Sequence, residues 1–248
     1  MDFVSGEILC IDKPLSWTSF DAVKRLRSEL IRRLGIRKFK VGHAGTLDPL
    51  ATGVMIICTG RATRRIEELQ AGVKEYEATL ALGATTPSFD LETEVDATYS
   101  TAHITEQLVR STLTKFIGAI EQVPPAYSAC KIEGVRAYDL ARQGQDVDLK
   151  PKTLVIDNIE LLEYSQESIR IRVVCSKGTY IRALARDIGQ ALDSGAHLTA
   201  LRRTRVGNVT IDNCMSVQAA AEMIKVCPLE FPEDYQAPQN KKQNNQSR

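Results

Sequence analysis

The sequence of 248 residues has none of the usual signatures of a metal or nucleotide site. Its six cysteines are scattered without a Cys-x-x-Cys pair and it has only three histidines, so no zinc or iron site is predicted. Glycine-rich loops of the kinds that hold a dinucleotide or a triphosphate are also missing. We therefore expect no metal and no small-molecule cofactor, and we expect reduced cysteines, as in a cytoplasmic protein.

The chain also lacks an apolar run long enough to cross a bilayer and a leader-like segment, so we expect no membrane association. With 43% hydrophobic and 25% charged residues, its composition is that of an ordinary globular protein. The net charge is only +1, but it is unevenly distributed. Segments 1–75 and 176–207 each carry +4 and segment 76–130 carries −5, which predicts a surface with one side that attracts polyanions.

The stretch 41–60 is the most distinctive part of the chain. Its glycines and its proline predict a turn-rich loop that leads into a buried strand at 54–58. Within the loop, Pro49 keeps the preceding residue out of helical geometry, so Asp48 lies on extended backbone and is suited to act on a ligand. The dipeptide alone favours a purely structural Asp-Pro turn.

The complete string favours a functional loop. Gly-His-Ala-Gly-Thr-Leu-Asp-Pro-Leu-Ala-Thr-Gly, residues 42–53, resembles the catalytic-aspartate motif of the TruB-type pseudouridine synthases, which isomerise the T-loop uridine at tRNA position 55. The resemblance implies that Asp48 is the nucleophile and that His43 occupies the space left by a flipped-out base. For His43, the alternative is a loop histidine whose hydrogen bonds are satisfied by the backbone.

The N-terminal segment carries a second matching motif. Gly-Glu-Ile-Leu-Cys-Ile-Asp-Lys-Pro, residues 6–14, followed by Thr-Ser, resembles the family's N-terminal signature and contains Lys13. Thr18 and Asp21 then form a capping box, which predicts a helix that continues to about 34. The outer faces of this helix are basic, which indicates either an ordinary solvated surface or one that contacts RNA phosphates.

Two further segments resemble the family between residues 60 and 83. Gly-Arg-Ala-Thr-Arg is similar to the family's Gly-x-Ala-Thr-Lys, with Arg64 in place of the lysine, so Arg64 and Lys13 are weaker candidates for contacts with RNA. Residues 74–83 alternate between two faces and predict a strand that buries Tyr76. Core packing alone would explain this tyrosine, but the family's Lys-x-Tyr strand supplies an active-site tyrosine.

The acidic loop at 84–102 departs from the family. The usual Thr-Asp-Thr-x-Asp-x-x-Gly is replaced by Thr-Pro-Ser-Phe-Asp-Leu-Glu-Thr-Glu, in which Asp90 remains but the glycine is missing. We therefore take no site residue from this loop. The apolar spacing that follows predicts a helix over 105–120.

Residues 124–151 form a long connection of a length that usually has a function. It interleaves aromatic and basic residues, a composition suited to stacking on bases and contacting phosphates. Pro-Pro-Ala-Tyr-Ser-Ala-Cys-Lys, which ends at Lys131, resembles the start of the family's RNA-gripping insertion, so Lys131 is a further candidate for RNA contact.

A third motif, Cys-Ser-Lys-Gly-Thr-Tyr-Ile-Arg, covers 175–182 and precedes a predicted helix for which Thr179 is the expected N-cap. An arginine here is usually a surface cation. The family resemblance implies instead that Arg182 pairs with Asp48, and that Tyr180 and Leu201 line a pocket for uracil. Such a pairing would keep the carboxylate ionised in a desolvated pocket.

The remainder predicts a helix at 217–226 and a disordered, polar tail at 230–248. We expect one catalytic domain over 1–229, including the insertion, with too few residues left for the full C-terminal RNA-binding module that related synthases often carry.

The alternation of strands and helices favours an α+β domain around a mixed, mostly antiparallel sheet. The resemblance implies the pseudouridine synthase fold with a central cleft and the T-arm stem-loop of tRNA as partner. The sequence leaves the oligomeric state open, and since no heptad or exposed apolar stripe argues against a monomer, we expect one. The alternative is a tRNA-binding or tRNA-folding protein of the same fold that works without catalysis.

Overall fold

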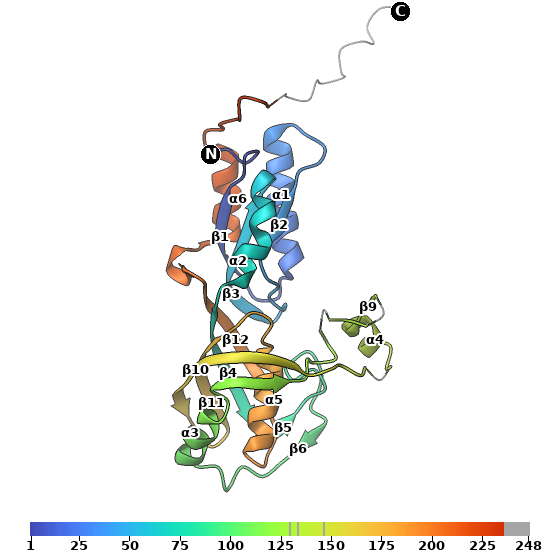
Figure 1. Cartoon of the computed structure of the whole chain (residues 1–248), viewed down its shortest axis with the longest axis vertical. Helices are drawn as coiled ribbons and strands as arrows, with labels where there is room; N and C mark the ends of the chain where they lie inside the picture. Colours follow the sequence, from blue (N-terminus) through green and yellow to red (C-terminus); the bar gives the residue numbers. More distant parts are fainter. Residues whose placement is uncertain (129, 133, 146, 236–248) are drawn as a thin grey trace, which may run out of the picture.

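The computed structural model describes residues 1–128, 130–132, 134–145 and 147–235. Ten strands form the main sheet: β1 Ile8–Lys13, β2 Val41–His43, β3 Ala51–Thr59, β4 Lys74–Leu82, β7 Gly118–Gln122, β10 Lys152–Tyr164, β11 Ser168–Cys175, β12 Ala196–Val206, β13 Val209–Thr210 and β14 Met215–Ser216. Their order is β14-β1-β3-β12-β4-β11-β10-β7, with β2 beside β3 and β13 beside β12 (Figure 1). Only the β1–β14 and β3–β12 pairs are parallel. The predicted mixed, mostly antiparallel sheet is confirmed.

Helices pack at both ends of this sheet, and one more lies in the segment that projects from its side. They are α1 Ser19–Leu34, α2 Ile66–Ala71, α3 Glu106–Thr114, α4 Ala137–Arg142, α5 Ile181–Ala191 and α6 Val217–Val226, with 3₁₀ turns η1 Gly60–Arg65 and η2 Ile211–Asn213. In Figure 1, α1 and α6 lie together in the upper half against β1, and α3 and α5 lie in the lower half. Strands β3 and β12 pair in parallel where the halves meet, so residues 51–53 of β3 lie beside residues 201–203 of β12.

Strand β3 is buried on both of its faces in the upper half of the molecule. Met55 and Ile57 pack in a core with α1 and α6, whereas Val54, Ile56 and Cys58 pack in a second core on the opposite face. A strand that is buried on both faces is expected to be continuously apolar, as the sequence predicted for 54–58. This burial makes β3 a rigid base for the loop that precedes it.

The helix predicted after Thr18 is confirmed as α1. Thr18 Oγ1 accepts a hydrogen bond from the Asp21 amide, and the Asp21 carboxylate accepts one from the Thr18 amide. These reciprocal bonds satisfy two amides that a helix start leaves without intrahelical partners. The helix therefore begins at a defined residue, immediately after the segment that borders the candidate site.

The helix predicted over 105–120 is wrong beyond its third turn. Helix α3 ends at Thr114, and β7 starts at Gly118 and pairs with β10. Gly118 has φ +104°, which is incompatible with a right-handed helix and is tolerated because glycine has no side chain. Sheet pairing with a distant strand overrides the local apolar spacing.

The prediction that Thr179 caps the next helix is also wrong. Thr179 Oγ1 donates to the carbonyl of Ser176, and the N-cap residue of α5 is Tyr180, which makes no side-chain cap bond. The side chain of Gln122 instead accepts from the Tyr180 amide at 2.9 Å and donates to its carbonyl at 3.2 Å. The start of α5 is therefore held by β7.

The insertion is not wholly irregular. It contains the hairpin β8 Lys131–Ile132 and β9 Val135–Arg136 followed by α4, and it projects from the side of the sheet in Figure 1. A second hairpin, β5 Ala84–Thr85 with β6 Ala97–Thr98, brackets the acidic loop.

The first residues of the C-terminal tail contact the N-terminal part of the chain and one another. The Glu230 amide donates to the Met1 carbonyl, Asp234 pairs with Arg61, and the rings of Phe231 and Tyr235 stack. Residues 236–248 lie outside the described part of the chain. Within the described part, no helix has the length and apolarity needed to span a membrane.

Replacing Thr18 with Ala should lower the free energy of unfolding by about 1 kcal/mol, because the capping box loses its hydroxyl acceptor. The melting temperature should fall by about 2–4 °C in thermal denaturation. Thr114→Ala is the matched control, since its exposed hydroxyl only donates to the Ser111 carbonyl within α3. Equal shifts in both variants would contradict the role assigned to the cap.

Candidate active site

The loop that carries Asp48 is held by hydrogen bonds on both sides of this residue. The buried hydroxyl of Ser19 donates to the Leu47 carbonyl at 3.0 Å and accepts from the Leu47 amide at 2.8 Å. On the other side, the Ser16 amide donates to the Pro49 carbonyl at 2.8 Å. The start of α1 and the segment before it thus position the loop. The Asp48 side chain remains 38% exposed.

Arg182, in the first turn of α5, pairs with this carboxylate. Its Nε lies 2.9 Å from Asp48 Oδ2, and its side chain is only 5% exposed. Nη1 donates to the carbonyl of Ser88 at 3.3 Å. The two residues expected to pair are therefore brought together, with the cation buried and the carboxylate accessible.

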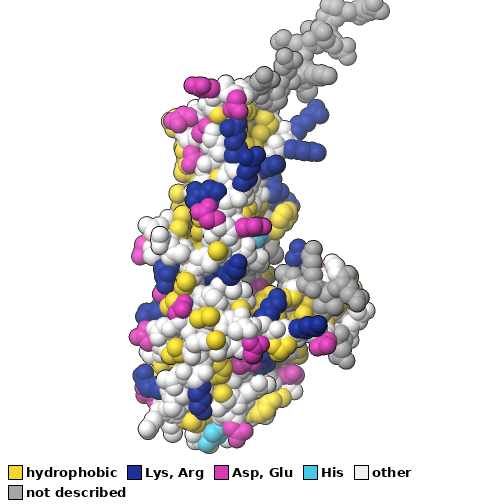
Figure 2. Space-filling view, in the orientation of Figure 1, with side chains coloured by type: hydrophobic (Ala, Val, Ile, Leu, Met, Phe, Trp, Pro, Cys, Tyr) yellow, Lys and Arg dark blue, Asp and Glu magenta, His cyan; other side chains and the backbone are white. Residues whose placement is uncertain are grey.

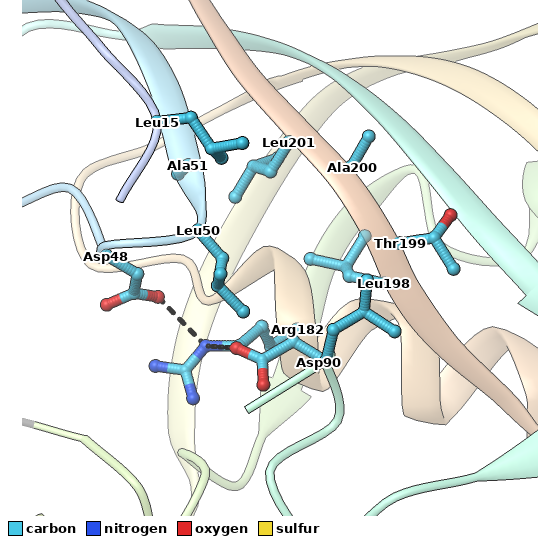
Figure 3. A pocket seen from close by; sticks show the side chains of 11 residues that line it. Leu15, Asp48, Leu50, Ala51, Asp90, Arg182, Leu198, Thr199, Ala200 and Leu201 are labelled. Atoms are coloured by element: carbon cyan, nitrogen blue, oxygen red, sulfur yellow. Dashed lines mark hydrogen bonds and ion pairs between the residues drawn. The ribbon is translucent and has the colours of Figure 1, made fainter. Parts of the chain in front are cut away.

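Asp90 is a site residue that sequence reasoning missed. Its side chain is 8% exposed, and Oδ2 lies 3.5 Å from Arg182 Nε, so two carboxylates share one guanidinium (Figure 3). Sequence reasoning set the acidic loop aside because the family glycine is missing. The signal that could have identified Asp90 is the aspartate itself, which this loop retains from the family pattern. Its Oδ1 accepts a hydrogen bond from the Glu92 amide at 2.9 Å, so the local turn forms although the family's glycine is missing.

These side chains open into a cavity of about 110 Å³. Figure 3 shows Asp48, Asp90 and Arg182 at one end and apolar side chains around the remainder. The lining residues are Leu15, Asp48, Leu50, Ala51, Asp90, Leu91, Arg182, Leu198, Thr199, Ala200 and Leu201. The cavity is suited to a small, flat, mostly uncharged group whose reacting atoms face a carboxylate.

Tyr76 is not among the residues that line the cavity. It is 8% exposed and belongs to the same buried cluster as Leu47 and Ala51, which flank the Asp48 loop. Burial raises the pKa of the Tyr76 hydroxyl, and the charge of Arg203 opposes this effect. The phenol is therefore held in its neutral form.

Tyr180 and His43 also lie outside the cavity lining. The Tyr180 hydroxyl is 3.3 Å from Cys130 Sγ in the insertion, and burial raises its pKa. His43 is the last residue of β2, and burial lowers the pKa of its imidazole, which favours the neutral ring. The role of Tyr180 in lining a uracil pocket and the role of His43 in replacing a flipped-out base stay predictions.

The three candidates for RNA contact differ in exposure. Lys13 is 0% exposed, and its ammonium donates to the carbonyls of Pro14 at 2.8 Å and Trp17 at 2.6 Å, so its contact with RNA stays a prediction. Arg64 is exposed in η1. Lys131 begins β8, and its side chain lies outside the described part of the structure.

The arrangement supports chemistry at a carboxylate. Among the residues that the structure describes, no group of histidine, cysteine, aspartate or glutamate side chains is arranged to hold a metal ion. An accessible carboxylate oriented by a buried guanidinium can act as a nucleophile or stabilise positive charge on a bound group.

Comparisons with known proteins agree with one another. The N-terminal domain model of the TruB family pseudouridylate synthases matches residues 32–181, and a tRNA pseudouridylate synthase B C-terminal domain model matches 182–228. The tRNA pseudouridine synthase B of Phocaeicola vulgatus is 67% identical over 90% of this chain and 95% of its own length. That of Parabacteroides distasonis is 62% identical over 94% and 100%.

Solved structures extend the likeness to the fold. Chains of an archaeal box H/ACA sRNP Nop10–Cbf5 complex and of a Cbf5–Nop10–Gar1 complex give TM-scores of 0.63 and 0.65, each at 28% identity and over 90% of this chain. The matches cover 54% and 55% of those solved chains, so this chain spans about half of their length.

Lys13 gives a pH-dependent prediction. Burial lowers the pKa of its ammonium from 10.5 to about 8, although Asp48 opposes the shift. Above pH 8 the unfolded chain binds a proton that the native amine has lost, so stability should rise with pH, by up to about 1.4 kcal/mol per pH unit. Urea unfolding at pH 7–10 should show this rise relative to Lys13→Met. A constant difference between the two proteins would refute it.

Proposed function

Because this chain belongs to the TruB family of pseudouridylate synthases, we propose that it converts uridine to pseudouridine in tRNA, at position 55 of the T-loop. The observation that carries the proposal is the Asp48–Arg182 pair at the end of an apolar cavity. The bacterial relatives named as tRNA pseudouridine synthases, at 62–67% identity, support tRNA as the substrate.

The geometry suits this reaction. Pseudouridine formation breaks the N–C glycosidic bond, turns the uracil and rejoins it through carbon, without net oxidation or hydrolysis. It requires a carboxylate beside the sugar and a space in which the base can turn. Asp48 supplies the carboxylate as nucleophile, and Arg182 orients it. The apolar walls, including Leu201, supply a surface for the uracil.

A T-loop uridine must leave its stack to reach such a cavity. In our proposal, His43 occupies the region that the base vacates, and its neutral ring avoids the cost of burying a charge. Tyr180, tied to Cys130 of the insertion, contacts the uracil once the RNA is bound. Tyr76, which is buried in β4 opposite Arg203, offers a phenol for proton transfer.

The T-arm stem-loop is the proposed binding partner, and exposed cations are available for its phosphates. In Figure 2, Lys and Arg side chains gather in the upper part of the molecule, where α1 and α2 lie in Figure 1. The Gly60 amide donates to the Lys40 carbonyl, which places exposed Lys40 beside the turn that carries Arg64. Lys131 is proposed to contact RNA from the insertion. A cytoplasmic monomer completes the proposal.

A tRNA-binding protein that acts without catalysis is less well supported. Binding alone does not require an accessible carboxylate paired with a buried arginine beside an apolar cavity. Desolvating this arginine has a cost that a function in catalysis explains.

The decisive test uses a tRNA transcript tritiated at uridine C5 and no added cofactor, since formation of the new C–C bond releases the C5 hydrogen. Wild type should release tritium, and Asp48→Asn should be slower by at least about a thousandfold, because the nucleophile is lost. Filter binding should give a similar dissociation constant for both proteins. Binding without release by wild type would overturn the proposal, and a transcript with uridine 55 replaced by cytidine tests the position.

Asp90 should affect catalysis more than binding. Asp90→Asn removes one of the two negative charges on Arg182, which alters how that arginine holds Asp48. A misplaced reacting group costs up to about a hundredfold in rate, so the single-turnover rate should fall about tenfold to a hundredfold. Asp96→Asn is the matched control in the same loop, since Asp96 is exposed and accepts from Thr85 Oγ1. Equal rates for the two variants would remove Asp90 from the site.

A further inference from the structure

Arg203 of β12 is a buried cation that the proposed chemistry does not use. It is 1% exposed and is among the largest fully buried side chains. The neighbouring Arg202 and Arg205 are partly exposed and pair with Asp12 at 2.9 Å and Glu75 at 3.5 Å. Across the described residues, no carboxylate forms an ion pair with Arg203.

Main-chain carbonyls take the place of a carboxylate. Nε donates to the carbonyl of Val54 at 2.7 Å, Nη1 to that of Thr46 at 3.3 Å, and Nη2 to that of Gly45 at 3.3 Å. These acceptors lie on both sides of Asp48 in sequence, since two precede it in the loop and one follows it in β3. The guanidinium therefore joins the two ends of the segment that presents the carboxylate.

Stability alone does not explain a side chain of this kind. A buried charge without a counter-ion costs several kcal/mol, and an apolar residue of similar volume is often at least as stabilising. A planar group with five donors in a fixed fork can, however, hold several carbonyls in a more rigid arrangement than the rotatable ammonium of a lysine. The arrangement indicates that Arg203 is retained for the geometry that it imposes.

The backbone around Arg203 is equally constrained. Arg203 lies opposite Gly53 of β3 and Tyr76 of β4, so it connects both neighbouring strands. Gly53 has φ +105°, and a Cβ atom there would lie 2.1 Å from the Arg203 carbonyl oxygen. Only glycine permits this close approach of β3 and β12. The separation between the arginine and the loop is thereby fixed.

We propose that Arg203 is a positioning residue for Asp48, whose three-way donation to the loop ends sets where the carboxylate stands relative to Arg182. This inference rests on the proposed function for its catalytic consequence. Its structural part, that the guanidinium orders segment 44–51, can be measured without any activity.

The kinetic test compares Arg203→Lys and Arg203→Met with Arg202→Lys, the same change at the adjacent, partly exposed arginine. Single-turnover tritium release should fall by at least about tenfold in both Arg203 variants, since a misplaced reacting group costs up to about a hundredfold. The dissociation constant for tRNA should change by less than about twofold. Arg203→Met removes a buried charge without a counter-ion but leaves three carbonyls without this donor, so Arg203→Lys, which keeps the charge, carries the test if Arg203→Met does not fold. Arg202→Lys should react like wild type.

Hydrogen exchange tests the ordering independently. The amides of Ala44, Leu47 and Ala51 donate to Ile56 O, Ser19 Oγ and Asp48 O. In the Arg203 variants they should exchange at least about tenfold faster, while amides in α6 keep their wild-type rates.

Three outcomes would overturn the inference: a wild-type rate in Arg203→Lys, unchanged loop exchange, or a loss of rate fully matched by a loss of tRNA binding. If wild type itself releases no tritium, the proposed function fails, and the exchange experiment still decides whether Arg203 orders the loop.

Discussion

The ion pair between Asp48 and Arg182 joins residues that are 134 positions apart in the chain, and much of the fold is needed to bring them together. Asp48 precedes β3, and Arg182 lies in the first turn of α5, which packs on β12. Because β3 and β12 pair in parallel through Ala51 and Leu201, the end of the Asp48 loop meets the strand against which α5 packs. Without that parallel pair, nothing would bring the loop that carries Asp48 close to the helix that carries Arg182.

The unequal exposure of the two partners matters as much as their distance. Arg182 is buried and held by Asp90 and the Ser88 carbonyl, so it has few other positions to adopt. Asp48 is partly exposed, so its carboxylate can approach a bound group while Oδ2 stays paired with Arg182. A surface ion pair would be screened by water and mobile, and a fully buried pair would exclude the substrate.

The sequence was a good guide where local rules determine the outcome. The capping box at Thr18, the alternation around Tyr76 and the doubly buried run at 54–58 all correspond to observed elements. It failed where distant contacts override local preference. Strand β7 replaces the end of a predicted helix because β10 pairs with it, and Gln122 of β7, rather than Thr179, holds the residue at which α5 starts. Asp90 was missed because its importance depends on Arg182, which lies 92 positions away.

Strand β12 combines two roles through simple periodicity. Residues two apart on a strand share a face, so Leu201 and Arg203 point the same way, and Arg202 points to the other side, where it meets Asp12. Leu201 lines the cavity, and Arg203 reaches the carbonyls of the loop that closes it. Register shifts at Leu198/Ala200 and Arg203/Arg205 confine this regular stretch to 200–203. Residues 200–203 thus supply both part of the apolar cavity wall and the arginine that holds the Asp48 loop, so a change in the register of β12 would disturb the cavity and the loop together.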